Sequence, residues 1–164
     1  MTDQPQTPLQ IAVIPVTPFQ QNCSILWCTR TKQAVVVDPG GDVSLIRGAL
    51  KEVGVTPAAI WLTHGHLDVA GGTGDVAFSV LHVPGHTPGH VTFFQKDLRF
   101  LLAGDTVFAG SVGRTDFPYG SHETLIAGIR NKLLPLGDDV QFLPGHGPAG
   151  TLGEERTNNP FLQG

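Results

Sequence analysis

The sequence predicts an α+β fold in which two similar halves pack sheet against sheet, with helices on the outer faces. The chain contains 21 Gly and 13 Pro among 164 residues, nearly twice their usual combined share of about 12%, which disfavours a helical bundle. Short runs rich in Ile, Val and Leu alternate with turn residues, as the strands of antiparallel sheets do. The predicted elements also repeat one order, in which several strands are followed by a helix and a further strand. Each half therefore has a helix that can cover its sheet.

The first half begins with a polar segment, residues 1–8, that we expect to be loose. Its apolar runs predict strands at residues 9–16, 22–28, 34–37 and 59–62, the last of them buried. A helix is expected over residues 43–53, because positions 43, 46, 50 and 53 place apolar side chains on one face. Asp42 precedes this helix and is expected to cap it.

The second half is expected to repeat this arrangement. Its apolar runs predict strands at residues 76–83, 90–94, 98–103 and 140–143. Ser121 is expected to cap a helix whose core face runs from Leu125 to Leu134. Thr151 and Glu154 match a capping box that opens a short final helix. No linker or low-complexity segment separates the halves, so residues 1–164 are expected to form a single domain.

Charge, hydropathy and cysteine spacing exclude several classes of protein. The net charge of −4 and the lack of a basic cluster argue against a nucleic-acid partner. The sequence has no run of ~20 apolar residues, so no membrane partner is expected. Residues 1–10 lack the basic and apolar stretches of a secretory signal, which favours a cytoplasmic location. Cys23 and Cys28 lie five positions apart on one predicted strand. Because side chains alternate along a strand, we expect the two to face opposite sides and not to form a disulfide with each other.

Five of the seven histidines lie directly beside a glycine, in loops that follow predicted strands. Residues 63–68 read THGHLD, so His64, His66 and Asp68 can turn toward one cavity. Imidazole and carboxylate groups are ligands that suit zinc, iron or manganese. A lone HxH pair is more often an ordinary loop feature, but three further loops contain such ligands. These loops are VPGHTPGH at 83–90, AGDT at 103–106 and LPGHGP at 143–148.

Together, these four motifs resemble the metallo-β-lactamase superfamily, which implies a four-layer αββα sandwich. PGHTPGH and the segment GSVGRTDFPYG at residues 110–120 are similar to single-domain bacterial hydrolases of the glyoxalase II type. The resemblance implies that one ion is held by His64, His66 and His86, that Asp105 bridges, and that Asp68 and His146 serve a second ion. Asp68 and Asp105 would also have the catalytic role of orienting the nucleophile.

The neighbours of these ligands also have expected roles. Arg114 lies where the resemblance places a cation near the glutathione carboxylate, while the alternative is a loop arginine paired with Asp116. His90 is expected to be a structural hydrogen-bonding residue. His82 is expected in the core and His122 in solvent.

The resemblance implies a metal-dependent hydrolase that cleaves a thioester, such as S-lactoylglutathione or a related hydroxyacyl thiol, by attack of a metal-bound hydroxide. It implies two divalent ions, zinc first with iron and manganese as alternatives, and a glutathione conjugate as small-molecule partner. The oligomeric state stays open. A first alternative is a persulfide dioxygenase with a single iron on His64, His86 and Asp105. A second alternative is a non-catalytic remnant that acts as a binding domain.

The chain departs from the superfamily pattern at one place. The pattern has a His directly after Asp68, where this chain has Val69, and a long insertion before the PGHTPGH loop. Here only 22 positions separate His64 from His86. One missing block explains both differences, so we expect the chain to lack a segment between residues 68 and 76. Three causes are open: the block is disordered and left out of the written sequence, was deleted artificially, or was lost naturally. We favour the first two, because natural loss of a helix and a strand would open the core by far more than a single cavity.

Overall fold

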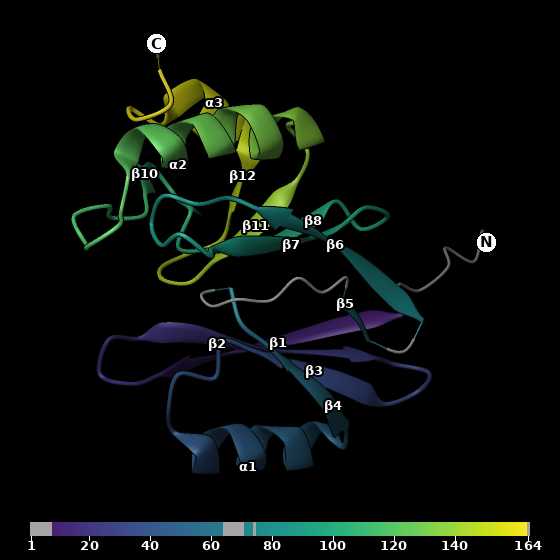
Figure 1. Ribbon diagram of the computed structural model, residues 1–164. Helices are drawn as coiled ribbons and strands as arrows, with labels where there is room; N and C mark the ends of the chain where they lie inside the picture. Colours follow the sequence, from purple (N-terminus) through teal and green to yellow (C-terminus); the bar gives the residue numbers. More distant parts are fainter. Residues whose placement is uncertain (1–7, 64–70, 74, 164) are drawn as a thin grey trace.

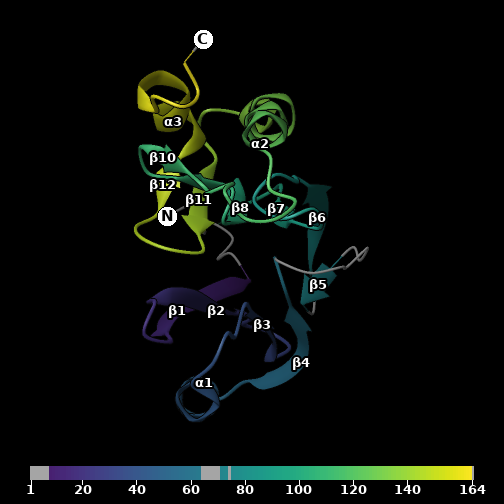
Figure 2. The same ribbon diagram turned by 60° about the vertical axis from the view of Figure 1, so that its left-hand side comes forward.

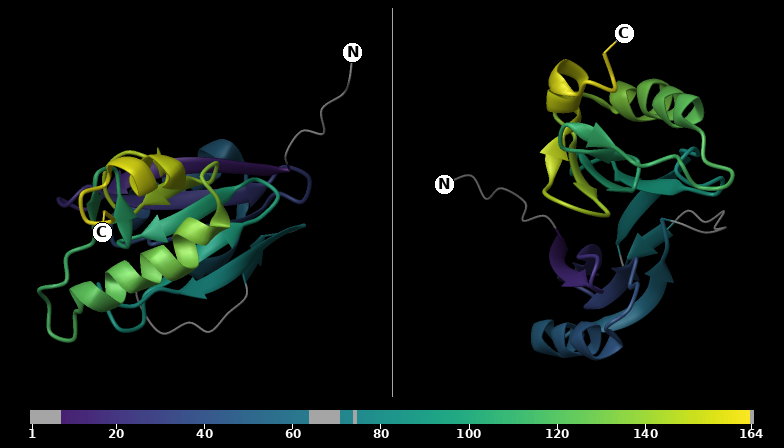
Figure 3. Two further views of the ribbon diagram at one scale, coloured as in Figure 1. Left: turned by 90° about the horizontal axis from the view of Figure 1, so that it is seen from above. Right: turned by 90° about the vertical axis from the view of Figure 1, so that its left-hand side faces the viewer.

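The computed structural model describes residues 8–63, 71–73 and 75–163. Four layers lie one above another: a helix, two sheets and a pair of helices (Figures 1 and 2). This is the αββα sandwich that the sequence predicts. The right-hand view of Figure 3 shows the helices on opposite outer faces. The lower helix is α1 (Val43–Val53), and the upper helices are α2 (His122–Gly128) and α3 (Leu152–Asn158).

The lower sheet has four strands in the order β1–β2–β3–β4. They span Leu9–Val16, Gln21–Cys28, Gln33–Val37 and Thr56–Trp61. The first three strands are antiparallel neighbours, while β4 runs parallel to β3. Parallel neighbours need a crossover connection, and α1 supplies it.

The upper sheet has six strands in the order β12–β11–β8–β7–β6–β5. In chain order, β5 to β8 span Gly71–Thr73, Val76–His82, Val91–Gln95 and Phe100–Gly104, and β11 and β12 span Gln141–Pro144 and Gly150–Thr151. The pair β8 and β11 is parallel, and α2 lies in its crossover. A π-helical turn, Ile129–Leu133, and a 3-10 turn, Leu134–Leu136, continue α2. A separate hairpin joins β9 (Val107–Phe108) to β10 (Ser111–Val112).

Three apolar clusters hold the layers together. The middle cluster lies between the sheets, where Trp61 packs edge-on against Phe78 with ring centroids 5.2 Å apart and stacks on Phe93 at 4.9 Å. The upper cluster joins the six-stranded sheet to α2 and α3, with Leu125 and Leu152 fully buried. The lower cluster packs α1 against β2 and β3. Burial of these apolar surfaces fixes the sheets relative to each other.

Most of the predicted elements are confirmed to within two residues, and only β4 begins three residues earlier than expected. The predicted caps of the last two helices are confirmed as well. The Ser121 hydroxyl accepts from the Thr124 N–H at 3.2 Å, and the Thr151 hydroxyl accepts from the Glu154 N–H at 3.3 Å. Cys23 and Cys28 are both buried and unpaired with each other, as expected.

The predicted cap of α1 is wrong. Asp42 stands at the N-cap position in a left-handed conformation, φ 51°, and its side chain makes no cap hydrogen bond. Its carboxylate accepts instead from the backbone N–H of Thr17 at 2.7 Å. Thr17 lies 25 residues away in the chain, in the turn between β1 and β2, so the sequence around Asp42 does not reveal this donor.

The predicted burial of the fourth strand is also wrong. Within β4 only Trp61 is buried, while Ile60 is 61% exposed, and Leu62, just after the strand, is 38% exposed. Alternation along a strand turns Trp61 into the space between the sheets and its neighbours outward. In the described residues β4 is an edge strand, and α1 packs on β2 and β3, so the outer face of β4 is left open.

His82 was expected in the core, and the structure contradicts this. It is the last residue of β6 and is exposed, with Nε2 2.8 Å from the carbonyl oxygen of Pro88. His122 is exposed, as expected. No helix in the described part of the chain is long and apolar enough to cross a membrane.

Candidate metal centre

The loops at one edge of the sandwich bring polar side chains together. Asp38 directly follows β3, Asp105 directly follows β8, and His146 lies in the loop after β11. His86 comes from the loop between β6 and β7. Because the carboxyl ends of the two parallel strand pairs meet at this edge, these four residues line one cavity of about 320 Å³.

His86 and His146 both face the carboxylate of Asp105. The Nε2 atom of His86 is 3.5 Å from Asp105 Oδ2, and Nε2 of His146 is 3.8 Å from the same oxygen. These separations are long for hydrogen bonds. They suit shared ligation, because two donor atoms on one tetrahedral ion lie roughly 3.4 Å apart. The side chains of His86 and Asp105 are largely buried, whereas His146 is 41% exposed and forms the open side.

A backbone contact fixes the ring of His86. Its Nδ1 lies 2.8 Å from the carbonyl oxygen of Arg114. A carbonyl oxygen only accepts, so Nδ1 carries a proton, and Nε2 is the ring nitrogen that faces Asp105. Ligand histidines commonly donate their other ring N–H in this way, so these residues fit a metal ion.

Asp105 is held by its backbone and by two glycines. Its N–H donates to Nε2 of the fully buried His90 at 3.0 Å, which confirms His90 as a hydrogen-bonding residue. A Cβ at Gly145 would collide with the Asp105 carboxylate, and a Cβ at Gly113 would collide with the Asp105 carbonyl oxygen. Glycine at both positions therefore leaves the space that this carboxylate occupies.

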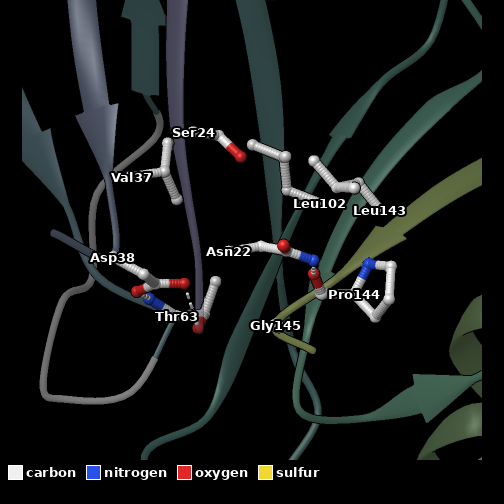
Figure 4. A pocket seen from close by; sticks show the side chains of 10 residues that line it. Asn22, Ser24, Val37, Asp38, Thr63, Leu102, Leu143, Pro144 and Gly145 are labelled. Atoms are coloured by element: carbon white, nitrogen blue, oxygen red, sulfur yellow. Dashed lines mark hydrogen bonds between the residues drawn. The ribbon is translucent and has the colours of Figure 1, made fainter. Parts of the chain in front are cut away.

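Asp38 shapes the same edge and was not singled out by the sequence analysis. It is 6% exposed, and its carboxylate accepts from both the N–H and the hydroxyl of Thr63 at 2.7 Å (Figure 4). Thr63 directly precedes the predicted ligand His64. The one available sequence signal was a carboxylate at the end of a wholly apolar run, residues 34–37.

Asn22 is the second residue that the sequence analysis missed. Its side-chain N–H groups donate to the carbonyl oxygens of Pro144 and Gly147, each at 3.1 Å, on either side of His146 in the chain. Figure 4 shows Asn22 reaching from β2 toward Pro144 across a small internal pocket. The contact ties the loop that carries His146 to the opposite sheet. A polar residue near a strand end is too common to signal such a role in advance.

Three predicted ligands, His64, His66 and Asp68, lie outside the described residues, and so does the junction between Asp68 and Val69. Among the residues that the structure describes, no group of three His, Cys, Asp or Glu side chains is sufficient to hold a metal ion by itself. The structure thus brings together part of the predicted ligand set, and the complete set stays a prediction.

A second and larger cavity, of about 580 Å³, also borders His86, Asp105 and His146. The rest of its lining is largely apolar: Phe19, Phe108, Ser111, Val112, Arg114 and Phe117. The three phenylalanines come from three different segments, the turn between β1 and β2, strand β9, and the loop before α2.

Arg114 is paired with Asp116, which is the alternative that the sequence analysis left open. Its Nε and Nη2 atoms donate to the two carboxylate oxygens, each at 2.7 Å. The guanidinium carbon also lies 4.2 Å from the centre of the Phe117 ring. A substrate role for this side chain stays a prediction.

Comparison with known families identifies the chain. A sequence profile described as the Metallo-beta-lactamase superfamily matches residues 16–78 and 70–146, which is most of the sequence. The chain belongs to the metallo-β-lactamase superfamily. This agrees with the αββα sandwich and with the histidine and aspartate loops at its edge.

Superfamily members match the chain along nearly its whole length. Hydroxyacylglutathione hydrolase GloC of Haemophilus influenzae is 35% identical, over 94% of this chain and 98% of the relative. The crystal structure of BLEG-1, a B3 metallo-β-lactamase, matches with a TM-score of 0.88 and 31% identity, over 94% of this chain and 100% of that one. TTHA1623 in a di-iron-bound form matches with a TM-score of 0.79 and 28% identity, over 92% and 100%. The chain is therefore a metallo-hydrolase of this superfamily.

The comparison with GloC supports the expected missing block. The alignment runs over 209 positions, more than the 164 residues of this chain, so the relative has residues with no counterpart here. The two matched stretches of the superfamily profile meet at residues 70–78. This place overlaps residues 68–76, where the sequence analysis expects the block to be absent.

Proposed function

We propose that this metallo-hydrolase cleaves a thioester, with a hydroxyacyl conjugate of glutathione such as S-lactoylglutathione as the first candidate. The observation that supports the proposal most is the approach of His86 and His146 to one oxygen of Asp105, with the Arg114 carbonyl holding Nδ1 of His86 so that Nε2 faces this carboxylate. The 35% identity to a relative named as a hydroxyacylglutathione hydrolase supports the thioester.

The proposed cofactor is a pair of divalent ions. Zinc is the first expectation, and iron and manganese are the alternatives, since imidazole and carboxylate ligands suit all three. The proposed ligands of the first ion are His64, His66 and His86, those of the second are Asp68 and His146, and Asp105 is shared.

Thioester hydrolysis forms a C–O bond at the acyl carbon and breaks the C–S bond, giving a carboxylic acid and a thiol. When bound, the ions supply a nucleophile near neutral pH by lowering the pKa of water, and they polarise the carbonyl group. Asp105 and Asp68 are proposed to orient this nucleophile, while the Arg114 carbonyl holds His86 in place. The thiolate leaves without a strong acid, because a free thiol has a pKa of about 8.5.

Thiol release from S-lactoylglutathione tests the proposal. Metal-free protein should be inactive, and added zinc or manganese should restore turnover, which a chelator should again remove. His86→Ala should lower turnover about a hundredfold or more, because it removes a ligand. His122→Ala, at an exposed histidine outside both cavities, is the matched control and should keep activity. A protein that binds two ions and releases no thiol would overturn the proposal.

Persulfide dioxygenation is the second candidate, because Val69 stands where the superfamily pattern has a further His ligand. A weakened second site favours a single iron on His64, His86 and Asp105. One bound iron with oxygen uptake on glutathione persulfide would support this candidate over the hydrolase. Loss of all metal on purification, with no turnover of either substrate, would instead support the non-catalytic remnant.

A further inference from the structure

The two histidines of the site that the structure describes are held in different ways. The ring of His86 is buried and held directly, because its Nδ1 lies 2.8 Å from the Arg114 carbonyl oxygen. The ring of His146 is 41% exposed, with Nε2 3.8 Å from Asp105 Oδ2. Among the described residues, no group forms a hydrogen bond with the His146 ring. The place of this ring therefore depends on the backbone of its own loop.

The loop that carries His146 is tied to both sheets by backbone hydrogen bonds. On the side of the upper sheet, the Gly145 N–H donates to the Gly104 carbonyl oxygen at 2.9 Å. On the side of the lower sheet, the N–H of Asn22, on β2, donates to the Gly145 carbonyl oxygen at 2.7 Å. The loop thus lies between the two sheets and takes its position from both.

The side chain of Asn22 adds the two contacts that flank His146. Its amide N–H groups donate to the carbonyl oxygens of Pro144 and Gly147, each at 3.1 Å (Figure 4). Pro144 lies two positions before His146, and Gly147 follows it directly. A primary amide carries two N–H donors on one nitrogen, so one short neutral side chain serves both carbonyl groups.

We propose that Asn22 is the positioning residue of the second metal ion, because its amide holds His146 where that ion binds. This inference rests on the proposed pair of ions. The ion beside His86 does not depend on Asn22 in the same way, since His86 takes its orientation from the Arg114 carbonyl. Loss of the Asn22 amide should therefore affect the two ions unequally, which a general loss of stability would not do.

Two substitutions at Asn22 separate its hydrogen bonds from its packing. Asn22→Leu keeps roughly the volume of the side chain and removes both donors, while Asn22→Ala removes the volume as well. Equilibrium dialysis against zinc, with zinc counted per chain, gives the affinity of each ion. In both variants the second ion should bind about tenfold to a hundredfold more weakly, as after other changes around metal ligands. The affinity of the first ion should stay within severalfold of the parent value.

The ring nitrogens of the two histidines show which ion is affected. In nuclear magnetic resonance spectra of both Asn22 variants, the His86 ring nitrogens should shift at the same zinc concentration as in the parent protein. Those of His146 should shift only at a higher concentration. In the metal-free protein, amide exchange at residues 145–147 should be faster in both variants than in the parent, because the loop has lost two of its contacts.

Two further variants are the controls. Asn131→Ala changes an exposed asparagine in the π-helical turn after α2, away from the His146 loop. Val36→Ala opens a cavity in the lower cluster, where Val36 is 4% exposed, and so lowers the stability of the fold without removing a contact of the loop. Both controls should bind the two ions as the parent protein does.

The results that overturn the inference differ from those that overturn the proposed function. Equal weakening of both ions in the Asn22 variants, or unchanged binding of the second ion, would overturn the role of Asn22 and leave the pair of ions standing. Weakening of the second ion in Val36→Ala as well would show a general effect of stability and would also overturn this role. A parent protein that binds one ion would overturn the proposed pair and the inference with it.

Discussion

Gly145 touches the central carboxylate of the site, so a single methyl group there should disturb metal binding. A Cβ at this position collides with the Asp105 side chain. We expect Gly145→Ala to weaken zinc affinity about tenfold to a hundredfold, as other changes in the shell around metal ligands do. Competition with a chromogenic chelator measures this affinity directly.

Gly48→Ala is the control for that substitution. Gly48 lies in α1, where a Cβ meets no atom within 4 Å. Zinc affinity should not change, and the free energy of unfolding should rise by up to about 1 kcal/mol, because alanine is the better helix former. Equal zinc affinities in both variants would argue against Asp105 as a ligand.

Asp38 is expected to act through Thr63, the residue before the first predicted ligand. Asp38→Asn replaces one of the two acceptor oxygens that Thr63 uses with a donor. The free energy of unfolding should fall by about 1–3 kcal/mol, because a buried polar group loses its partner. Urea denaturation measures the loss, with Asp97→Asn in the exposed turn after β7 as the control. Equal stability of the two variants would contradict this role.

Residue type and spacing were enough to predict that His86, Asp105 and His146 lie together, because the candidate ligands come from a short list of side chains and glycine marks their loops. The roles of Asp38 and Asn22 were not predicted, because both residues form hydrogen bonds with backbone or hydroxyl groups, and such groups occur in any sequence. Burial of His82 was wrongly predicted, because an apolar neighbourhood in the sequence does not show where a strand leaves the core.

At the scale of elements, α3 anchors the hairpin that forms one wall of the larger cavity. Glu155 and Asn159 are 4% and 0% exposed. The Glu155 carboxylate accepts from the Gly110 N–H at 2.9 Å and from the Asn159 amide at 2.8 Å. Asn159 also donates to the Ser111 carbonyl oxygen at 2.8 Å. The segment after this hairpin leads to the Arg114 carbonyl that orients His86.

Asn159→Ala should therefore loosen the hairpin. The variant leaves Glu155 and the Ser111 carbonyl without this donor. The free energy of unfolding should therefore fall by about 1–3 kcal/mol. Amide exchange at residues 110–113 should accelerate, and KM should rise by more than kcat falls. Thr157→Ala, at an exposed position of α3, is the control. Slow exchange at residues 110–113 in the Asn159 variant would show that α3 does not hold the hairpin.

Helix caps show which element features were predictable. Ser121 and Thr151 bond backbone groups three residues onward, so the local sequence contains all the partners. Asp42 is also a common N-cap residue, but its carboxylate accepts from the backbone N–H of Thr17 instead. That competition exists only in the folded chain.

At the scale of the whole molecule, the open outer face of β4 is the feature most directly related to the missing block. Ile60 is 61% exposed there. In the chain as written, Ile60→Lys should change the free energy of unfolding by less than about 0.5 kcal/mol, as exposed substitutions do. It should also reduce concentration-dependent self-association, because a lysine on an edge strand opposes pairing.

A natural protein that contains the block would respond differently. Ile60→Lys would then place a charge under covering residues and destabilise the fold strongly. Intact mass of the purified protein separates the causes, since a mass above that of the 164 residues would show that the block is present. Burial of β4 was not predictable from its residues, because an apolar strand is buried only if another segment of the chain covers it.

The central claim is that this edge of the sandwich holds catalytic metal. An anomalous-scattering map from a zinc-replete crystal tests it most directly, because it counts and places ions without assuming a substrate. We predict two peaks, one within about 2.0–2.2 Å of His86 Nε2, one equally close to His146 Nε2, and both near the Asp105 carboxylate. A map with no peak at these three residues would contradict every catalytic role proposed for the chain.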